Sequence, residues 1–268
     1  MSYRALFTDL DGTLLNARSE ISPANKAAIA DAFAAGKQVV LCSGRSWRSL
    51  DYFERALDML KPERYGVAFQ GGVVYESLSK RVLFSQKMEY EMALEIAKTL
   101  DGYGAAPLLY TDTRLTARRK TVNTEMYSRH ANLPVEYIQS FDEIKDGIQK
   151  IIVEGECDEL TEIAEKITPR FSGRCNIFFS ASDLIEFTHI DVHKGHGMRF
   201  LAHRLGIDMK EIIAVGDQGN DIEMLREAGL GVAVANATQG APEAADIVLE
   251  ESNDKDAVSK VIREWLLK

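Results

Sequence analysis

The sequence is poor in cysteine, with three in 268 residues: Cys42, Cys157 and Cys175. Their odd number and the absence of a Cys-x-x-Cys pair argue against a disulfide framework and against a thiolate zinc site. Unpaired cysteines with apolar neighbours favour a reducing compartment and a place in the protein core. We therefore expect a cytoplasmic protein.

Long apolar runs and excess positive charge are also missing. No apolar stretch approaches the ~20 residues of a membrane span, and no signal peptide opens the chain, so we expect no membrane partner. The 41 acidic residues outnumber the 32 Lys and Arg residues, giving a net charge of −9. This balance argues against nucleic acid as a partner. An anionic small substrate is compatible with it if a metal and a few local cations reverse the field in one pocket.

What is present is an ordinary globular composition, with 46% hydrophobic and 27% charged residues. Apolar strands alternate with helices in the first and last thirds of the chain, which is typical of a parallel sheet with crossover helices. The expected strands lie at 5–7, 38–42, 67–69, 212–215, 231–234 and 247–249, and a hairpin is expected from Gly71-Gly72 through Ser85. The expected helices follow Ser22-Pro23, run over 46–60 and 197–205, and begin at Asn220 and Asp256.

The middle third has a different organisation. Helices near 89–100 and 158–167 stand among strands at 108–110, 150–153, 176–179 and 184–187, and the last two form a hairpin. We therefore predict a core domain made of 1–86 and 188–268 with an α+β domain, 87–187, inserted into it. The basic cluster Arg114, Arg118, Arg119 and Lys120 either grips a second anionic group of a substrate or forms a solvated charged loop.

Two carboxylates follow the first strand, in the segment Asp9-Leu10-Asp11-Gly12-Thr13. The carboxyl edge of a parallel sheet is where ligands bind. The two acids start on opposite faces of the chain, and a turn at Gly12 can bring them together. Adjacent carboxylates repel one another, and a hard divalent cation relieves that repulsion. Asp-Gly is also an ordinary turn dipeptide.

Three further polar sites fall at strand ends or where the chain re-enters the core. Ser43-Gly44 offers a hydroxyl and an unhindered backbone N–H for a phosphate oxygen, although Ser43 or Ser46 could simply cap a helix. The segment from Gly216-Asp217 to Asn220-Asp221 repeats the strand, glycine and acid pattern. Lys194 alone would be a surface charge. Together these groups match phosphoryl transfer, in which positioning and charge neutralisation carry most of the catalysis.

These residues, in this order, resemble the four motifs of the haloacid dehalogenase (HAD) superfamily, and the long insertion resembles the cap of its subclass IIB, the Cof-type phosphatases. The resemblance implies an α/β fold with a Rossmann-like parallel-sheet core and an inserted α+β cap. It also implies dependence on Mg²⁺ and hydrolysis of small phosphorylated metabolites. A sugar phosphate is the expected substrate, and nucleotide, flavin and pyridoxal phosphates remain open.

The family scheme assigns a role to each motif residue. Asp9 is the nucleophile that forms an aspartyl-phosphate, and Asp11 protonates the leaving alcohol and then takes a proton from water. Mg²⁺ is held by the carboxylates of Asp9 and Asp217 and by the backbone carbonyl of Asp11, with Asp221 behind them. The phosphoryl oxygens are held by Leu10, Ser43, Gly44, Lys194 and Asn220.

Two positions depart from the family pattern. Gln70 precedes Gly71-Gly72 where relatives often have Asn-Gly-Ala, and His193 stands beside Lys194 where small polar residues are common. We expect these changes to alter how cap and core meet rather than the chemistry. His193 also carries the hypothesis of added pH sensitivity, which an unchanged pH–rate profile in His193→Ala would remove.

The sequence leaves two alternatives open. A phosphomutase of the same superfamily would pass the phosphoryl group to a sugar instead of water. A non-enzymatic phospho-accepting module also clusters acids at strand ends, but such modules lack an inserted cap and need no second acid two residues after the acceptor. The identity of the substrate and the oligomeric state are not determined by the sequence.

Overall fold

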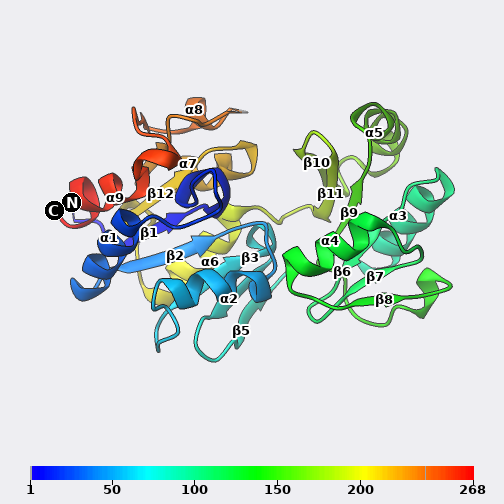
Figure 1. The fold of residues 1–268 in the computed structure, drawn as a ribbon, viewed down its shortest axis with the longest axis horizontal. Helices are drawn as coiled ribbons and strands as arrows, with labels where there is room; N and C mark the ends of the chain where they lie inside the picture. The colour runs from blue at the N-terminus through cyan, green and yellow to red at the C-terminus, as the bar shows by residue number, and fades with distance from the viewer. Residues whose placement is uncertain (1, 239) are drawn as a thin grey trace. The chain divides into compact units, whose positions relative to one another are not determined.

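The structure, a computed structural model, describes residues 2–238 and 240–268. The chain forms two compact units (Figure 1). The core unit combines the residues up to Ser85 with those from His193 to Lys268, and the inserted unit spans Gln86–Val192. In the described part of the chain, no helix is long and apolar enough to cross a bilayer.

The core unit is built on an eight-stranded sheet within the described residues, in the order β14-β13-β12-β1-β2-β3-β4-β5. The strands from β14 to β3 are parallel, and β4 and β5 form the antiparallel edge predicted as a hairpin. The bounds are β1 Ala5–Thr8, β2 Gln38–Cys42, β3 Tyr65–Ala68, β4 Val73–Glu76, β5 Val82–Ser85, β12 Ile212–Gly216, β13 Leu230–Ala233 and β14 Ile247–Val248.

Strand register brings the predicted motifs to one edge of this sheet. Thr8 of β1 pairs with Val215 on one side and with Leu41 on the other. β1 ends at this level, and β12 and β2 end one residue later, at Gly216 and Cys42. The chain therefore leaves the three strands, which Figure 1 shows side by side, at nearly the same level. β1 is buried along its whole length, which explains the apolar run Ala5-Leu6-Phe7 within it.

The first helix of the core unit begins as its sequence predicts. The Ser22 hydroxyl accepts a hydrogen bond from the Asn25 N–H, 3.1 Å away, with Pro23 at the first helical position, as predicted. The bounds are α1 Pro23–Ala34, α2 Trp47–Ala56, α6 Lys194–Leu205, α7 Ile222–Glu227, α8 Ala241–Ala244 and α9 Ala257–Val261. α2 ends four residues earlier than predicted because Asp58 takes a left-handed conformation (φ 55°).

The inserted unit has a six-stranded mixed sheet within the described residues, in the order β10-β11-β9-β6-β7-β8. Its strands are β6 Leu108–Tyr110, β7 Leu115–Ala117, β8 Val135–Tyr137, β9 Lys150–Glu154, β10 Cys175–Ala181 and β11 Leu184–His189. Its helices are α3 Tyr90–Gly102, α4 Val122–Ala131 and α5 Cys157–Phe171. The unit continues beyond the predicted end at residue 187 because β11 runs on to His189.

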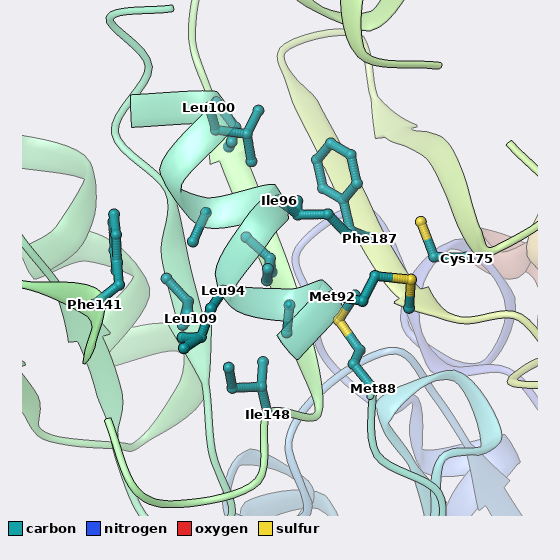
Figure 2. Close-up of a cluster of buried hydrophobic side chains, with 14 of the residues drawn as sticks. Met88, Met92, Leu94, Ile96, Leu100, Leu109, Phe141, Ile148, Cys175 and Phe187 are labelled. Carbon is teal, nitrogen blue, oxygen red and sulfur yellow. The ribbon is translucent and has the colours of Figure 1, made fainter. Parts of the chain in front are cut away.

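One face of the inserted sheet carries this unit's hydrophobic core (Figure 2). Met92, Ile96 and Leu100 repeat at four-residue intervals along α3 and pack with Leu109 of β6 and Phe187 of β11. Cys175 belongs to the same cluster, as expected for a core thiol. Cys157, by contrast, is exposed, so the expected core role is wrong for this residue.

Candidate active site

Three buried carboxylates converge at the carboxyl edge of the core sheet. Asp9 directly follows β1, and its N–H donates to the Val215 carbonyl of β12, 2.9 Å away. One carboxylate oxygen from each of Asp9, Asp217 and Asp221 lies within 4.8 Å of the others. The motifs after β1 and β12 therefore form one site, although Thr13 and Asp217, one from each, are 204 residues apart in sequence.

The turn after Asp9 takes the form that its glycine predicts. Gly12 has φ +79°, and a Cβ atom at this position would lie 2.4 Å from Asp217 Oδ2. The Thr13 hydroxyl donates to Asp217 Oδ1 at 2.7 Å, and Asn236 Nδ2 donates to the Gly12 carbonyl at 2.8 Å. Sequence reasoning gave Thr13 and Asn236 no role, although Thr13 stands inside the motif.

Lys194 is the buried cation of the site. It is the first residue of α6, which starts three residues earlier than predicted. Its Nζ donates to Asp9 Oδ1 at 2.5 Å and to Asp221 Oδ1 at 2.6 Å. Burial alone would lower the pKa of Lys194, but the charges of Asp221 and Asp9 outweigh it and raise the pKa above its usual value. Lys194 is therefore a fixed ammonium group and not a surface charge.

Asp221 also orders the loop after β12. Its Oδ2 accepts the backbone N–H groups of Asp217, at 2.9 Å, and of Gln218, at 3.0 Å. Its other oxygen is the partner of Lys194. Both oxygens of the Asp221 carboxylate thus accept hydrogen bonds from protein donors. Asp9 and Asp217 have fewer such bonds and are more available to bind a ligand.

The site holds more acidic groups than basic ones. Burial raises the pKa of Asp9 well above its usual value despite Lys194, and the neighbouring carboxylates add to the effect. Burial, reinforced by Asp221, likewise raises the pKa of Asp217 to about 6. Three acids face one ammonium group, and carboxylate oxygens are the ligands that hard divalent cations prefer. The triad is therefore suited to hold a metal ion.

The side chain of Asp11 lies outside this triad and is about half exposed. Arg45 Nε donates to Asp11 Oδ2 at 2.7 Å and Arg45 Nη2 to Oδ1 at 2.5 Å. These hydrogen bonds raise the pKa of Arg45. The guanidinium also lies 5.3 Å from the centre of the Phe53 ring. Sequence reasoning missed Arg45, although an arginine directly after Ser43-Gly44 was a signal for an anion partner.

The predicted phosphate-binding residues occupy the same edge of the sheet. Ser43 follows β2 and is buried, and its hydroxyl accepts the Arg45 N–H at 3.2 Å. Ser46, and not Ser43, caps α2 by accepting the Ser49 N–H. Asn220 Nδ2 donates to Gln70 Oε1 at 3.2 Å. Leu10 is buried in the turn after β1.

The basic cluster of the inserted unit is neutralised within that unit. Arg114 pairs with Glu136 and Asp146, and Lys120 pairs with Glu125. Arg118 and Arg119 share Asp101. The cluster is thus a set of ion-paired side chains, in agreement with the charged-loop interpretation and not with a cationic pocket.

Comparison with known proteins identifies the family. The model of the haloacid dehalogenase-like hydrolases matches residues 6–262. This chain belongs to that family. A solved structure from Thermotoga maritima is 31% identical, has a TM-score of 0.85 and covers 97% of each chain. The predicted α/β fold with a parallel core sheet and a second mixed sheet is confirmed.

Named relatives specify the reaction class. The chain is 26% identical to the pyridoxal phosphate phosphatase of Escherichia coli, covering 100% of both. It is 28% identical to the 5-amino-6-(5-phospho-D-ribitylamino)uracil phosphatase of Bacillus subtilis, covering 97% of this chain and 94% of that protein. It also matches a chloroplast endoribonuclease of Arabidopsis thaliana at 29% identity but spans 45% of its length. The HAD-family protein described here is a phosphoric monoester hydrolase that acts on small phosphorylated metabolites.

Proposed function

We propose that this phosphatase works through a covalent intermediate on Asp9. An Asp9 oxygen attacks phosphorus, forming an aspartyl-phosphate while the bond to the leaving oxygen breaks. The observation that carries the proposal is the position of Asp9, buried at the end of β1 and held by Lys194 at 2.5 Å. Lys194 orients the attacking carboxylate and offsets the charge that gathers there.

Asp11 is the proposed proton carrier. It donates a proton to the leaving alkoxide, and its carboxylate then accepts a proton from the water that attacks the aspartyl-phosphate. This second step releases inorganic phosphate and regenerates the Asp9 carboxylate. The Asp11 carboxylate must break at least one of its two hydrogen bonds with Arg45 before one of its oxygens can carry a proton.

The proposed phosphate pocket is lined by groups from four segments. The Ser43 hydroxyl, the Lys194 ammonium and the Asn220 carboxamide supply side-chain contacts, and Leu10 and Gly44 supply backbone N–H groups. Support comes from their common position at the carboxyl edge of the core sheet, where donors directed at an oxyanion stabilise its charge.

Mg²⁺ is the metal that we propose for the acidic triad. The carboxylates of Asp9 and Asp217 and the backbone carbonyl of Asp11 would hold it, and Asp221 would keep the loop and Lys194 in place. When bound, the ion supplies positive charge that neutralises the phosphoryl oxygens. The raised pKa of Asp217, about 6 without a metal, is the observation that favours a divalent cation here.

We infer that the substrates are phosphate esters of primary alcohols, with a sugar phosphate first among them. Both named relatives act on compounds whose phosphate is carried by a primary alcohol. The test is a panel of sugar 6-phosphates, pyridoxal phosphate and ribityl phosphates, ranked by kcat/KM with Mg²⁺ and with Asp9→Asn as the blank. A preference for secondary esters, or activity equal to that of the blank, would overturn the proposal.

The same assay separates a hydrolase from a phosphomutase. Water as the acceptor predicts one inorganic phosphate released per ester consumed, without any bisphosphate activator. A mutase would release little inorganic phosphate and would require the bisphosphate.

A further inference from the structure

Three successive residues at the end of β3 have left-handed backbone conformations. Phe69, Gln70 and Gly71 have φ values of 50°, 57° and 94°, and only the last is glycine. Phe69 and Gln70 are also buried. L-residues adopt this conformation uncommonly, and buried, bulky residues in it carry strain that gathers at functional sites. We call this segment, Phe69–Gly71, the left-handed corner.

The backbone of the left-handed corner is tied to the phosphate-binding segments. The Phe69 N–H donates to the Arg45 carbonyl at 2.9 Å, and the Gln70 N–H donates to the Ser43 carbonyl at 3.1 Å. Gly71 lies so close to α6 that a Cβ atom there would be 2.1 Å from the His193 carbonyl oxygen. The corner therefore touches the loop after β2 and the residue preceding Lys194.

The Gln70 side chain extends this connection to a third segment. Its Oε1 accepts a hydrogen bond from Asn220 Nδ2 at 3.2 Å, and a Cβ atom on Gly44 would lie 2.5 Å from its Nε2. One carboxamide thus fills the space between the loops after β2 and β12. A smaller side chain would leave that space empty, and any residue other than glycine at position 44 would displace Gln70.

The hydrogen bond from Asn220 Nδ2 to Gln70 also determines which atoms of the Asn220 amide are available to a ligand. Its Oδ1 is buried and has no hydrogen-bond partner in the described residues, so Gln70 alone orients this amide. An amide nitrogen carries two N–H groups, and the second remains for an oxyanion.

We propose that Gln70 is a positioning residue of the phosphate pocket, which holds Asn220 and the Ser43–Gly44 loop at the separation that a phosphoryl group requires. The proposal rests on the proposed function, because it assigns Gln70 to the same pocket. This role would explain the backbone strain of the left-handed corner, because the corner sets the separation between Asn220 and the Ser43–Gly44 loop. A carboxamide suits the place because it is neutral and offers both a donor and an acceptor.

Gln70→Gly separates the carboxamide from the backbone strain. Glycine adopts a positive φ without penalty, so relief of backbone strain should offset the lost packing of the side chain, and this variant should lose the bridge with little change in melting temperature. Glu63→Gly is the matched control, because Glu63 also has a positive φ (59°) but is exposed. Gln70→Glu keeps the shape of the side chain but places a negative charge beside the pocket.

The measurement is the dissociation constant of inorganic phosphate in Mg²⁺, by isothermal titration calorimetry, together with its inhibition constant against p-nitrophenyl phosphate and the melting temperature. Gln70→Gly should bind phosphate at least tenfold more weakly at an unchanged melting temperature, and Gln70→Glu more weakly still. Glu63→Gly should match the wild type. Phosphate binding by Gln70→Gly within twofold of the wild type would overturn the proposal.

One further variant and the activity of the wild type complete the test. If Gln70→Gly does not fold, Gln70→Asn carries the same comparison, because asparagine tolerates left-handed backbone and its amide is one methylene short. Weakened phosphate binding in a folded Gln70→Asn supports the proposal, and wild-type binding overturns it. A wild-type protein that hydrolyses no phosphate ester would contradict the proposed function itself. An active wild type whose phosphate binding does not change on substitution of Gln70 would contradict only the role of Gln70.

Discussion

Arg45 holds Asp11 by both carboxylate oxygens, with Nε to Oδ2 at 2.7 Å and Nη2 to Oδ1 at 2.5 Å. The side chain proposed to carry the proton is thereby fixed beside the buried carboxylates and not among them. A planar guanidinium matches a carboxylate in this two-point geometry, whereas a lysine offers only a point charge. The pair therefore orders an Asp11 side chain that is otherwise half exposed.

Arg45→Lys should slow the turnover of esters with poor leaving groups. Loss of the two-point contact leaves Asp11 less well placed, and misplacement of a catalytic group by about 1 Å costs up to ~100-fold in rate. We expect kcat to fall about tenfold for a sugar phosphate and little for p-nitrophenyl phosphate, whose leaving group needs no proton. Equal losses for the two substrates would show that Arg45 does not act through Asp11.

Lys194→Met should destabilise the protein as well as inactivate it. The variant leaves two buried carboxylates, Asp9 and Asp221, without their shared cation. Removal of one partner from a buried ion pair costs about 3–5 kcal/mol in free energy of unfolding, which urea denaturation measures. Lys166→Met is the control, because its exposed pair with Glu162 is worth less than about 1 kcal/mol. Similar losses in both variants would contradict the assigned burial of Lys194.

Stability should depend on pH and metal together. The pKa of Asp217 is raised from 3.8 to about 6, so the folded state binds this proton more tightly than the unfolded state. Its contribution to stability is complete below pH ~4 and is lost as pH rises through about 6, a change of about 3 kcal/mol at most.

Mg²⁺ should reverse that loss, because it competes with the proton for the same carboxylate. The rise in melting temperature between EDTA and MgCl₂ should therefore be small at pH 5 and large at pH 8. Asp217→Asn should make the rise smaller and weaken its pH dependence, of which Asp9 keeps a part. A rise of equal size at both pH values would be incompatible with a metal on Asp217.

Gly12→Ala and Gly36→Ala form a matched pair. Both glycines have a positive φ, +79° and +74°, but a Cβ atom on Gly12 would lie 2.4 Å from Asp217 Oδ2, whereas one on Gly36 would meet nothing within 4 Å. Each substitution carries a backbone cost of about 1–3 kcal/mol, and Gly12→Ala adds about 1–3 kcal/mol of steric cost. Only Gly12→Ala should lose activity. Equal activity in both variants would show that the turn after Asp9 tolerates a side chain.

The sequence predicted the carboxyl-edge site because the inference needed only two regularities. Apolar runs identify parallel strands, and parallel neighbours end at one edge, so Asp9, Ser43 and Asp217 had to be close. The roles assigned to them as nucleophile, phosphate contact and metal ligand remain predictions. The parallel core sheet and the hairpins at its edge and in the insertion follow from the same local patterns.

Features set by contacts between loops could not be predicted in this way. The choice of Arg45 as partner for Asp11 depends on how two turns face each other. Phe69 continues an apolar strand in sequence but leaves β3 in a left-handed turn, because its backbone bonds to the loop after β2. α4 was missed since only Thr124 and Ala131 of its residues are buried, so that no apolar stripe marks it.

The covalent role of Asp9 is tested most directly by trapping the intermediate. Enzyme mixed with ³²P-labelled ester and Mg²⁺ is quenched in acid within milliseconds, and the acyl phosphate is located by borohydride reduction and mass spectrometry. We predict label on Asp9, none in Asp9→Asn, and formation at a rate no slower than kcat. Wild-type turnover without label on Asp9, or undiminished hydrolysis by Asp9→Asn, would contradict the proposed mechanism.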